Sequence, residues 1–402
     1  MAELPMNNRR AVLAGLGGLG LAGLGGCATS GAPAQTAPVR PGLAALPRLA
    51  PVRAGMDRVT RITVCLRPFR AAGPRLDVEM VGDKRVVHNY GHGGAGWSLS
   101  WGSSAIAVEK AMAGGTREAA VIGCGALGLT SALLLQRAGA KVTIYAAERA
   151  PMTRSARATG TWSPDSRIAD AARVAADFPA TWERMARTSY AEYQTWLGLP
   201  GAPVSWSDRY SLFDDATAPP APSPGPTNAI RFFGAPLPGL APRWRDLSPQ
   251  EHPFPVSRVR HGVAMQFNVA ELSHLLMTDF LLAGGRMETR TFNSPGELTT
   301  LPQAVIVNCT GYGARALWKD ETMTPVRGQI TWLAPQPELT YGLYWRHISV
   351  LPRADGIVVQ DGGDSEMFGY GIEDETPDRG EAERAVKTIA DLYASMGAGP
   401  PR

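Results

Sequence analysis

Cysteine is scarce in this sequence of 402 residues, which contains four of them: Cys27, Cys65, Cys124 and Cys309. They lie far apart and form no C-x-x-C pair, so the sequence indicates neither a disulfide framework nor a zinc ribbon. The histidines show no ligand spacing either. His88 and His92 flank Asn-Tyr-Gly within a glycine-rich loop, so they do not share one face of a helix. We therefore expect no metal site, and we expect the last three cysteines to be buried thiols.

The sequence also lacks an excess of charge of one sign. Its 40 Lys and Arg residues nearly balance 36 Asp and Glu residues, and no sustained basic block occurs. Proteins that follow a phosphate backbone concentrate such charge, so we expect no nucleic-acid partner. With 44% hydrophobic residues, a chain of this length can bury a sizeable core.

The apolar run at 11–26 is too short and too rich in glycine for a membrane span, which needs about 20 strongly apolar residues. It follows Arg9 and Arg10, a pair that resembles a twin-arginine export signal. It ends in a lipobox-like Leu-Gly-Gly before Cys27, which predicts a lipid anchor there, with an incidental cysteine as the alternative. We expect an exported protein of the periplasm or cell envelope, with a Pro/Ala-rich tether after the signal.

The strongest chemical motif lies between residues 118 and 148. A short apolar strand, a glycine-rich turn, an amphipathic helix and a second strand follow one another there, as in a β-α-β unit. Gly123, Gly125 and Gly128 form G-x-G-x-x-G, which permits a tight turn, close approach to a pyrophosphate and helix packing. Glu148 stands where an acid accepts from ribose hydroxyls, so the unit predicts dinucleotide binding rather than a non-binding glycine turn.

Two other segments suit a second approach to the same dinucleotide. Residues 305–311 predict a buried strand that ends in a small-residue turn, and residues 88–98 form a loop with four glycines that leads into a helix at 101–112. Flexible backbone that runs into a helix N-terminus makes an anion site. A reduced flavin is anionic, so this loop could lie against a flavin. The alternative is that 88–98 is a plain surface loop.

The sequence HNYGHGGAGWSLSWG at 88–102, with LRPFR at 66–70, strongly resembles D-amino-acid oxidases, including D-aspartate oxidases, of the FAD-dependent oxidoreductase superfamily. RATGTWSP at 157–164 resembles their flavin-facing turn. VNCTG at 307–311 and PVRGQ at 325–329 resemble the stretch that leads into their substrate domain. The resemblance covers residues from about 58 to 375 and implies FAD as the cofactor.

The resemblance implies oxidation of a D-amino acid by molecular oxygen to a 2-oxo acid, ammonia and hydrogen peroxide. The substrate carboxylate would bind Arg67, its amine would face main-chain carbonyls near Gly94, and no side chain would serve as general base. Tyr344 would replace the tyrosine that the family places beside the arginine, because Ser349 occupies the aligned position. The implied FAD-binding residues are Gly93, Gly94, Ala95, Gly96, Trp97, Ser98, Gly123, Gly125, Ala126, Leu127, Gly128, Glu148, Arg149, Ala158, Thr159, Gly160, Thr161, Trp162, Thr310 and Gly311.

The order of these segments is reversed relative to the family, in which the nucleotide unit comes first. This order predicts a circular permutation, in which a final helix at about 381–396 ends near the strand that contains 62–65. The expected fold class is α/β, with a Rossmann-like FAD-binding domain and a second α+β substrate domain built on an antiparallel sheet. We expect the FAD-binding domain to run from Arg58 to about Arg167. The strand near Val305 is expected to join the same domain later in the chain.

We expect an export signal at 1–27, a tether at 28–57, a permuted segment with the substrate arginine and the flavin loop at 58–112, and the Rossmann unit at 116–167. The substrate domain is expected mainly at 168–300, followed by a return to the FAD domain at 301–323, the rest of the substrate domain at 324–375, and a final helix and tail at 376–402. Two functional alternatives stay open at this stage. One is an FAD-dependent oxidase of glycine-like or N-substituted amines, and the other is a catalytically silent flavin-binding lipoprotein. No feature of the sequence sets an oligomeric state.

Overall fold

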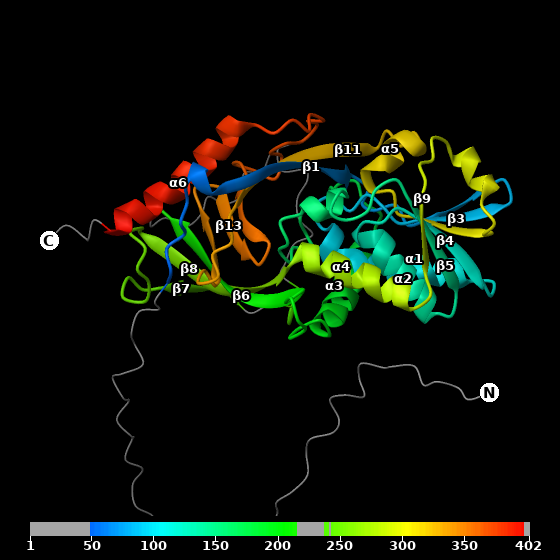
Figure 1. Cartoon of the computed structure of the whole chain (residues 1–402), viewed down its shortest axis with the longest axis horizontal. Helices are drawn as coiled ribbons and strands as arrows, with labels where there is room; N and C mark the ends of the chain where they lie inside the picture. Colours follow the sequence, from blue (N-terminus) through cyan, green and yellow to red (C-terminus); the bar gives the residue numbers. More distant parts are fainter. Residues whose placement is uncertain (1–48, 215–236, 241–242, 398–402) are drawn as a thin grey trace, which may run out of the picture. The chain divides into compact units, whose positions relative to one another are not determined.

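The computed structural model describes residues 49–214, 237–240 and 243–397 (Figure 1). The predicted export signal and the tether up to residue 48 lie outside the described residues. The last part of the expected tether, 49–57, is corrected, because Val52 is buried in the core of the eight-stranded sheet and the carbonyl of Ala50 accepts from Tyr341. The described chain builds two sheets, one of six strands and one of eight. Within it, no helix is both long enough and apolar enough to cross a bilayer.

The six-stranded sheet is the expected Rossmann-like sheet, and all its neighbouring strands are parallel except the β2–β3 edge pair. Its strand order is β2 (Val78–Val81), β3 (Lys84–His88), β10 (Val305–Asn308), β4 (Glu118–Ile122), β5 (Lys141–Ala146) and β9 (Arg286–Thr289). One face packs on helices α1 (Gly96–Met112), α2 (Ala126–Arg137) and α4 (Val269–Leu282). The other packs on residues around η5 (Pro295–Thr300) and α5 (Ala314–Leu317). Burial on both faces explains why the central strands read as continuous small or apolar runs.

The eight-stranded sheet is mixed rather than antiparallel, so that expectation was wrong in one pair. Its order is β1 (Val59–Arg70), β11 (Met323–Leu333), β14 (Gly356–Asp361), β13 (Ile348–Arg353), β12 (Tyr341–Trp345), β6 (Val204–Phe213), β8 (Arg258–Phe267) and β7 (Arg245–Leu247). Among its named pairs, only β12 and β6 run parallel, and the long stretch of chain between them permits this direction, which a short hairpin would not.

Strand β1 also corrects the expected boundary of the FAD-binding domain. It pairs antiparallel with β11 along almost its whole length, from Val59 opposite Leu333 to Arg70 opposite Met323. Figure 1 shows the two strands side by side although they come from opposite parts of the chain. The segment from 58 to 70 therefore belongs to the eight-stranded sheet, and the chain enters the six-stranded sheet only at β2 and β3.

Helix α6 (Arg379–Gly397) covers one face of the eight-stranded sheet and brings the ends of the described chain together. Leu392 on this helix shares a core cluster with Val52, and Met396 and Val59 pack at the edge of that cluster. Tyr393 also bonds through its hydroxyl to Tyr341, at 2.6 Å. The last helix thus ends near the start of β1, as the permutation requires; the permuted origin of the order itself stays a prediction.

The remaining elements surround the two sheets. Helix α3 (Phe178–Gln194) packs against α1, and the short turns η2 (Met56–Arg58), η3 (Arg154–Arg157) and η6 (Gly311–Gly313) join strands and helices. The crossing of α1 and α3 is close because residue 102 is glycine. A Cβ there would lie well inside van der Waals contact with the main chain of Met185. The main-chain N–H of Gly102 also donates to the hydroxyl oxygen of Ser189, at 2.8 Å.

Gly102→Ala is expected to lower the free energy of unfolding by about 1–3 kcal/mol, because the helices must separate to admit the methyl group. Urea unfolding followed by circular dichroism measures the effect. Gly296→Ala is the matched control, since a Cβ at Gly296 would meet only the Ser294 hydroxyl, at 3.9 Å. Equal stability of the two variants would contradict the close packing of α1 and α3.

Candidate functional site

A cavity of about 590 Å³ lies where the carboxyl ends of β4, β5 and β10 approach β1 and β11. The residues that follow β4, β5 and β10 all line it, from the turns at 123–127, 146–148 and 309–313. Ligands of parallel α/β sheets bind at this edge, outside the carboxyl ends of the strands. The opposite wall comes from the eight-stranded sheet, through residues of β1, β11 and β14.

The glycine turn between β4 and α2 is shaped by close approaches of backbone. Gly123 has φ of +104°, and a Cβ there would lie 2.5 Å from the carbonyl oxygen of Cys309. At Gly125 a Cβ would lie 2.6 Å from the Ser155 hydroxyl. At Gly128 it would overlap the carbonyl of Gly123, so this glycine lets the helix pack on the turn. The turn therefore keeps bare backbone at the cavity, which suits a pyrophosphate.

The glycine loop at 88–98 is fixed to this turn by the buried side chain of Asn89. The Asn89 amide nitrogen donates to the hydroxyls of Ser104 on α1, at 3.2 Å, and Ser131 on α2, at 3.1 Å. Its oxygen accepts from Ser103 at 2.6 Å, and its main-chain N–H donates to the carbonyl of Asn308 at 2.8 Å. Through its side chain and its main-chain N–H, Asn89 thus ties together the three segments that sequence motifs had pointed to.

Arg67 reaches the cavity from β1. Its Nη1 donates to the carbonyls of Val326, at 3.4 Å, and Arg327, at 3.1 Å. The guanidinium lies over Gly328, where any Cβ would displace it. Burial, followed by the nearby positive charge of Arg167, lowers the pKa of Arg67 to about 10, which still leaves it charged at neutral pH. A fixed guanidinium of this kind can bind a carboxylate through two parallel hydrogen bonds.

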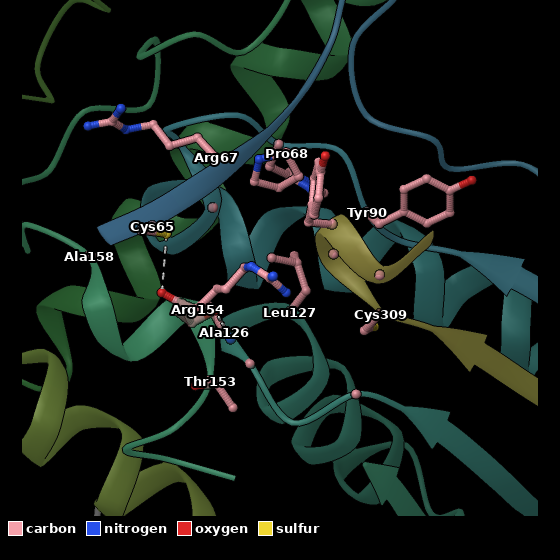
Figure 2. A pocket seen from close by; sticks show the side chains of 18 of the residues that line it. Cys65, Arg67, Pro68, Tyr90, Ala126, Leu127, Thr153, Arg154, Ala158 and Cys309 are labelled. Atoms are coloured by element: carbon pink, nitrogen blue, oxygen red, sulfur yellow. Dashed lines mark hydrogen bonds between the residues drawn. The ribbon is translucent and has the colours of Figure 1, made fainter. Parts of the chain in front are cut away.

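Figure 2 shows how this part of the cavity is arranged around β1. The Cys65 thiol, two residues before Arg67, is directed toward the main-chain carbonyl of Arg154, at 3.5 Å. Cys124 and Cys309 line the cavity as well. Burial raises the pKa of all three thiols, to about 11 for Cys124 and about 12 for Cys309. Cys124 and Cys309 are buried as expected, whereas Cys65 is half-buried, and the raised pKa values keep these thiols protonated at neutral pH.

The cavity brings most of the predicted site residues together. Those that line it are Arg67, Gly93, Gly94, Gly96, Trp97, Ser98, Gly123, Gly125, Ala126, Leu127, Glu148, Ala158, Thr159, Gly160, Thr161, Thr310 and Gly311. Four predicted FAD-binding residues do not line it. Ala95 is buried ahead of α1, Gly128 packs on Gly123, Arg149 donates to the carbonyl of Met287, and Trp162 packs on Tyr190.

Tyr344 does not line the cavity either, so its placement beside Arg67 is corrected. It pairs across the sheet with Ser349, which pairs with Gln360, and of these three only Gln360 lines the cavity. Paired residues share one face of a sheet, so Tyr344 faces the same side but lies two strands farther along. Its side chain is 39% exposed.

Sequence reasoning missed several residues that line the cavity: Thr153, Arg154, Ser155, Arg157, Arg167, Gly328 and Gln360. The first four lie in and before η3, between the strand that ends near Glu148 and the turn at 157–164. Their position could have revealed them in the sequence, because a segment that joins two cofactor-facing turns must pass close to the cofactor. Among the described residues, no group of three or more His, Cys, Asp or Glu is arranged to hold a metal ion.

In a comparison with protein families, residues 118–400 match the family described as FAD dependent oxidoreductase (DAO). The chain belongs to this family. FAD is accordingly its cofactor, and the chain is an oxidoreductase of the group that includes amino acid oxidases. The bare glycine turn, where added Cβ atoms would fill the space, fits the cofactor. Gly123, Gly125, Ala126 and the loop at 93–98 would hold it.

Two bacterial D-amino-acid oxidases are similar in sequence. The protein from Streptomyces coelicolor is 30% identical over 216 residues, and that from Rubrobacter xylanophilus is 28% identical over 226 residues. Each match covers 53% of this chain and 58% of the relative, so the chain spans a little over half the length of these curated relatives. An L-amino acid deaminase from Proteus vulgaris is a distant structural neighbour, with a TM-score of 0.41, 14% identity and coverage of 61% of this chain and 60% of that one.

Gly123→Ala is expected to weaken FAD binding by about tenfold or more, because the methyl group both disfavours the positive φ and pushes the turn away from Cys309. The ratio of flavin absorbance to protein absorbance, with FAD titration of the stripped protein, measures it. Gly139→Ala is the matched control, since Gly139 has φ of +91° in the same unit but open space around its Cα. Equal FAD affinity of the two variants would rule out the cradle.

Two buried histidines predict that the protein loses stability in mild acid. Burial lowers the pKa of His92 to about 3, and burial with the nearby Arg75 lowers that of His88 to about 4. The unfolded chain takes up these protons below about pH 6.5 and the folded chain does not, so stability falls as pH drops from 6.5 toward 4. Each histidine contributes a slope of up to about 1.4 kcal/mol per pH unit.

Urea unfolding at several pH values tests this dependence. His92→Asn is expected to flatten the slope relative to the unaltered protein, whereas His274→Asn, at an exposed position on α4, should leave it unchanged. A slope that is the same in all three proteins would show that burial of the His92 ring does not control its protonation.

Proposed function

We propose that this protein is an FAD-dependent oxidase of D-amino acids. The reaction would convert the amino acid, water and oxygen into a 2-oxo acid, ammonia and hydrogen peroxide. One observation carries the proposal: Arg67, on a strand of the eight-stranded sheet, lines the same cavity as the G-x-G-x-x-G turn of the six-stranded sheet. The names of the two bacterial relatives support the choice of D-amino acids.

In this proposal the chain binds and orients the substrate, and its side chains take no proton from the reacting carbon. FAD, when bound, would supply the acceptor for the hydride of the substrate Cα and the route of its electrons to oxygen. Arg67 holds the α-carboxylate, since its guanidinium is fixed by the carbonyls of Val326 and Arg327. Fixing the carboxylate leaves few orientations for the Cα–H bond, which is how positioning lowers the barrier.

The loop at 93–98 would complete the site. It lies at the N-terminus of α1, where unpaired N–H groups favour negative charge. The Ser98 hydroxyl accepts from the main-chain N–H of Ser163, at 2.8 Å, which holds the loop to the turn at 157–164. We also propose that the protein is exported by its signal segment and anchored through Cys27, in keeping with the sequence at 9–27.

A panel of D-amino acids, L-amino acids, glycine and N-methyl amines tests the reaction class, with hydrogen peroxide as the product measured. D-Amino acids are expected to give peroxide, and their L-enantiomers are not. Turnover confined to glycine or N-methyl amines would replace the proposal with the alternative oxidase. A flavin-loaded protein that turns over none of these compounds would contradict both enzymes.

Arg67→Lys is expected to raise KM for the amino acid by roughly 10- to 100-fold, because an ammonium group cannot bind the carboxylate through a planar fork. Arg61→Lys is the matched control: it lies on the same strand and face, where Arg61 stacks over Trp332 at 4.3 Å, outside the cavity. Flavin content should be the same in both. Unchanged KM in Arg67→Lys would refute the role of the guanidinium.

A further inference from the structure

The cavity has a surplus of positive charge. Among the described residues that line it, Glu148 is the one residue with a carboxylate side chain. Five residues carry a guanidinium group: Arg67, Arg154, Arg157, Arg167 and Arg290. Low-dielectric walls strengthen the field of such groups, so the cavity favours ligands with additional negative charge.

Arg167 is the arginine that lies next to Arg67. The turn at Gly93 connects them, because its N–H donates to the carbonyl of Pro68 at 2.8 Å, and a Cβ at Gly93 would overlap the carbonyl of Arg167. The other arginines have partners elsewhere. Arg154 and Arg157 both pair with Glu375, and Arg290 donates to Thr300.

The main chain holds Arg167 in a constrained position. Its φ is +49°, in the left-handed region that side chains other than glycine rarely adopt. The neighbouring carbonyl of Ser166 accepts from the N–H of Gly94, at 3.0 Å, which locks this turn onto the glycine loop. Strained backbone of this kind occurs where the surrounding structure requires it, often around a ligand. The side chain of Arg167 is largely buried, at 11% exposure.

Glu366 occupies the guanidinium of Arg167. The Arg167 Nε donates to the main-chain carbonyl of Glu366 at 2.9 Å, and Nη1 lies 3.1 Å from its carboxylate. Glu366 belongs to the segment after β14 and its side chain is 44% exposed, so it can leave without unfolding a strand. The Glu366 carboxylate thus pairs with the Arg167 guanidinium, which lines the cavity close to Arg67.

We propose that Arg167 is a second substrate-binding residue, and that the amino acid oxidised at this site carries a second carboxylate. This proposal rests on the proposed function. The α-carboxylate binds Arg67, and the distal carboxylate takes the place of the Glu366 carboxylate on Arg167. The substrate class is the dicarboxylic D-amino acids, in which one or two methylene groups separate the distal carboxylate from Cα.

The other two classes of side chain fit this arrangement less well. A cationic side chain would lie beside two guanidinium groups, and neighbouring like charges repel each other. An apolar side chain would leave the Arg167–Glu366 pair in place and gain no ionic partner. A second carboxylate exchanges one charge-assisted hydrogen bond for another at Arg167 and adds the attraction of Arg67.

Variants at the two partners should shift substrate preference in opposite directions. The measured quantity is the ratio of kcat/KM for D-glutamate to that for D-alanine, in the FAD-loaded full chain. Arg167→Gln is expected to lower this ratio about tenfold or more. Glu366→Gln is expected to raise it, because the competing carboxylate is gone. Arg173→Gln is the matched control, since its side chain is 73% exposed and lies outside the cavity.

A binding measurement separates this inference from the proposed function. Calorimetric titration with glutarate, which has two carboxylates, is compared with titration with pentanoate, which has the same number of carbons and one carboxylate. Glutarate is expected to bind at least about tenfold more tightly, and Arg167→Gln should remove most of that difference. This result would support the second site even if no D-amino acid were turned over.

Two results would overturn the inference while leaving the D-amino acid oxidase intact. One is turnover of D-amino acids with a ratio that neither Arg167→Gln nor Glu366→Gln changes. The other is equal affinity for glutarate and pentanoate in the unaltered protein. If Arg167→Gln fails to fold or to hold FAD, Glu366→Gln and the two probes decide alone.

Discussion

The antiparallel pairing of β1 with β11 is the constraint on which the site depends. Strand β1 precedes the nucleotide-binding unit in the chain, and β11 follows it by more than a hundred residues, yet they pair from Val59–Leu333 to Arg70–Met323. This register sets Arg67 over Gly328, where only the absence of a side chain leaves room for the guanidinium. Because β1 then leads into β2, β3 and the loop at 88–98, the same pairing delivers the glycine loop to the G-x-G-x-x-G turn.

A buried polar network then holds these segments in place on the side of the six-stranded sheet. Asn89 links the loop to α1, α2 and the end of β10, and His92 contacts Ser103 at 2.7 Å. Such a network is stabilising only when its members are paired, and a half-satisfied one is costly. The paired members of this network hold the loop in its position against the turn, although the buried Nδ1 of His92 has no partner among the described residues. Arg167 follows from that position, because Gly93 and Gly94 touch the main chain at 166–167.

The sequence was most informative where local backbone chemistry decides the structure. The β-α-β unit, the strand at 305–308 and the helix after the glycine loop follow from glycine spacing and hydrophobic patterns, and the structure confirms them, except that the helix begins at Gly96, within the expected loop, rather than at Trp101. It was least informative where long-range pairing decides. The parallel neighbours β12 and β6 and the approach of Arg167 to Arg67 depend on register between distant segments. No local pattern encodes such register.

The central claim is that β1 and the glycine turn build one site, in which a D-amino acid is oxidised. Anaerobic mixing of the FAD-loaded protein with a D-amino acid tests it most directly, because it isolates electron transfer to the flavin from reoxidation. The account predicts loss of the visible absorption band of the flavin with dicarboxylic D-amino acids and no loss with their L-enantiomers. A flavin that stays oxidised with every D-amino acid, in protein with full FAD content, would contradict it.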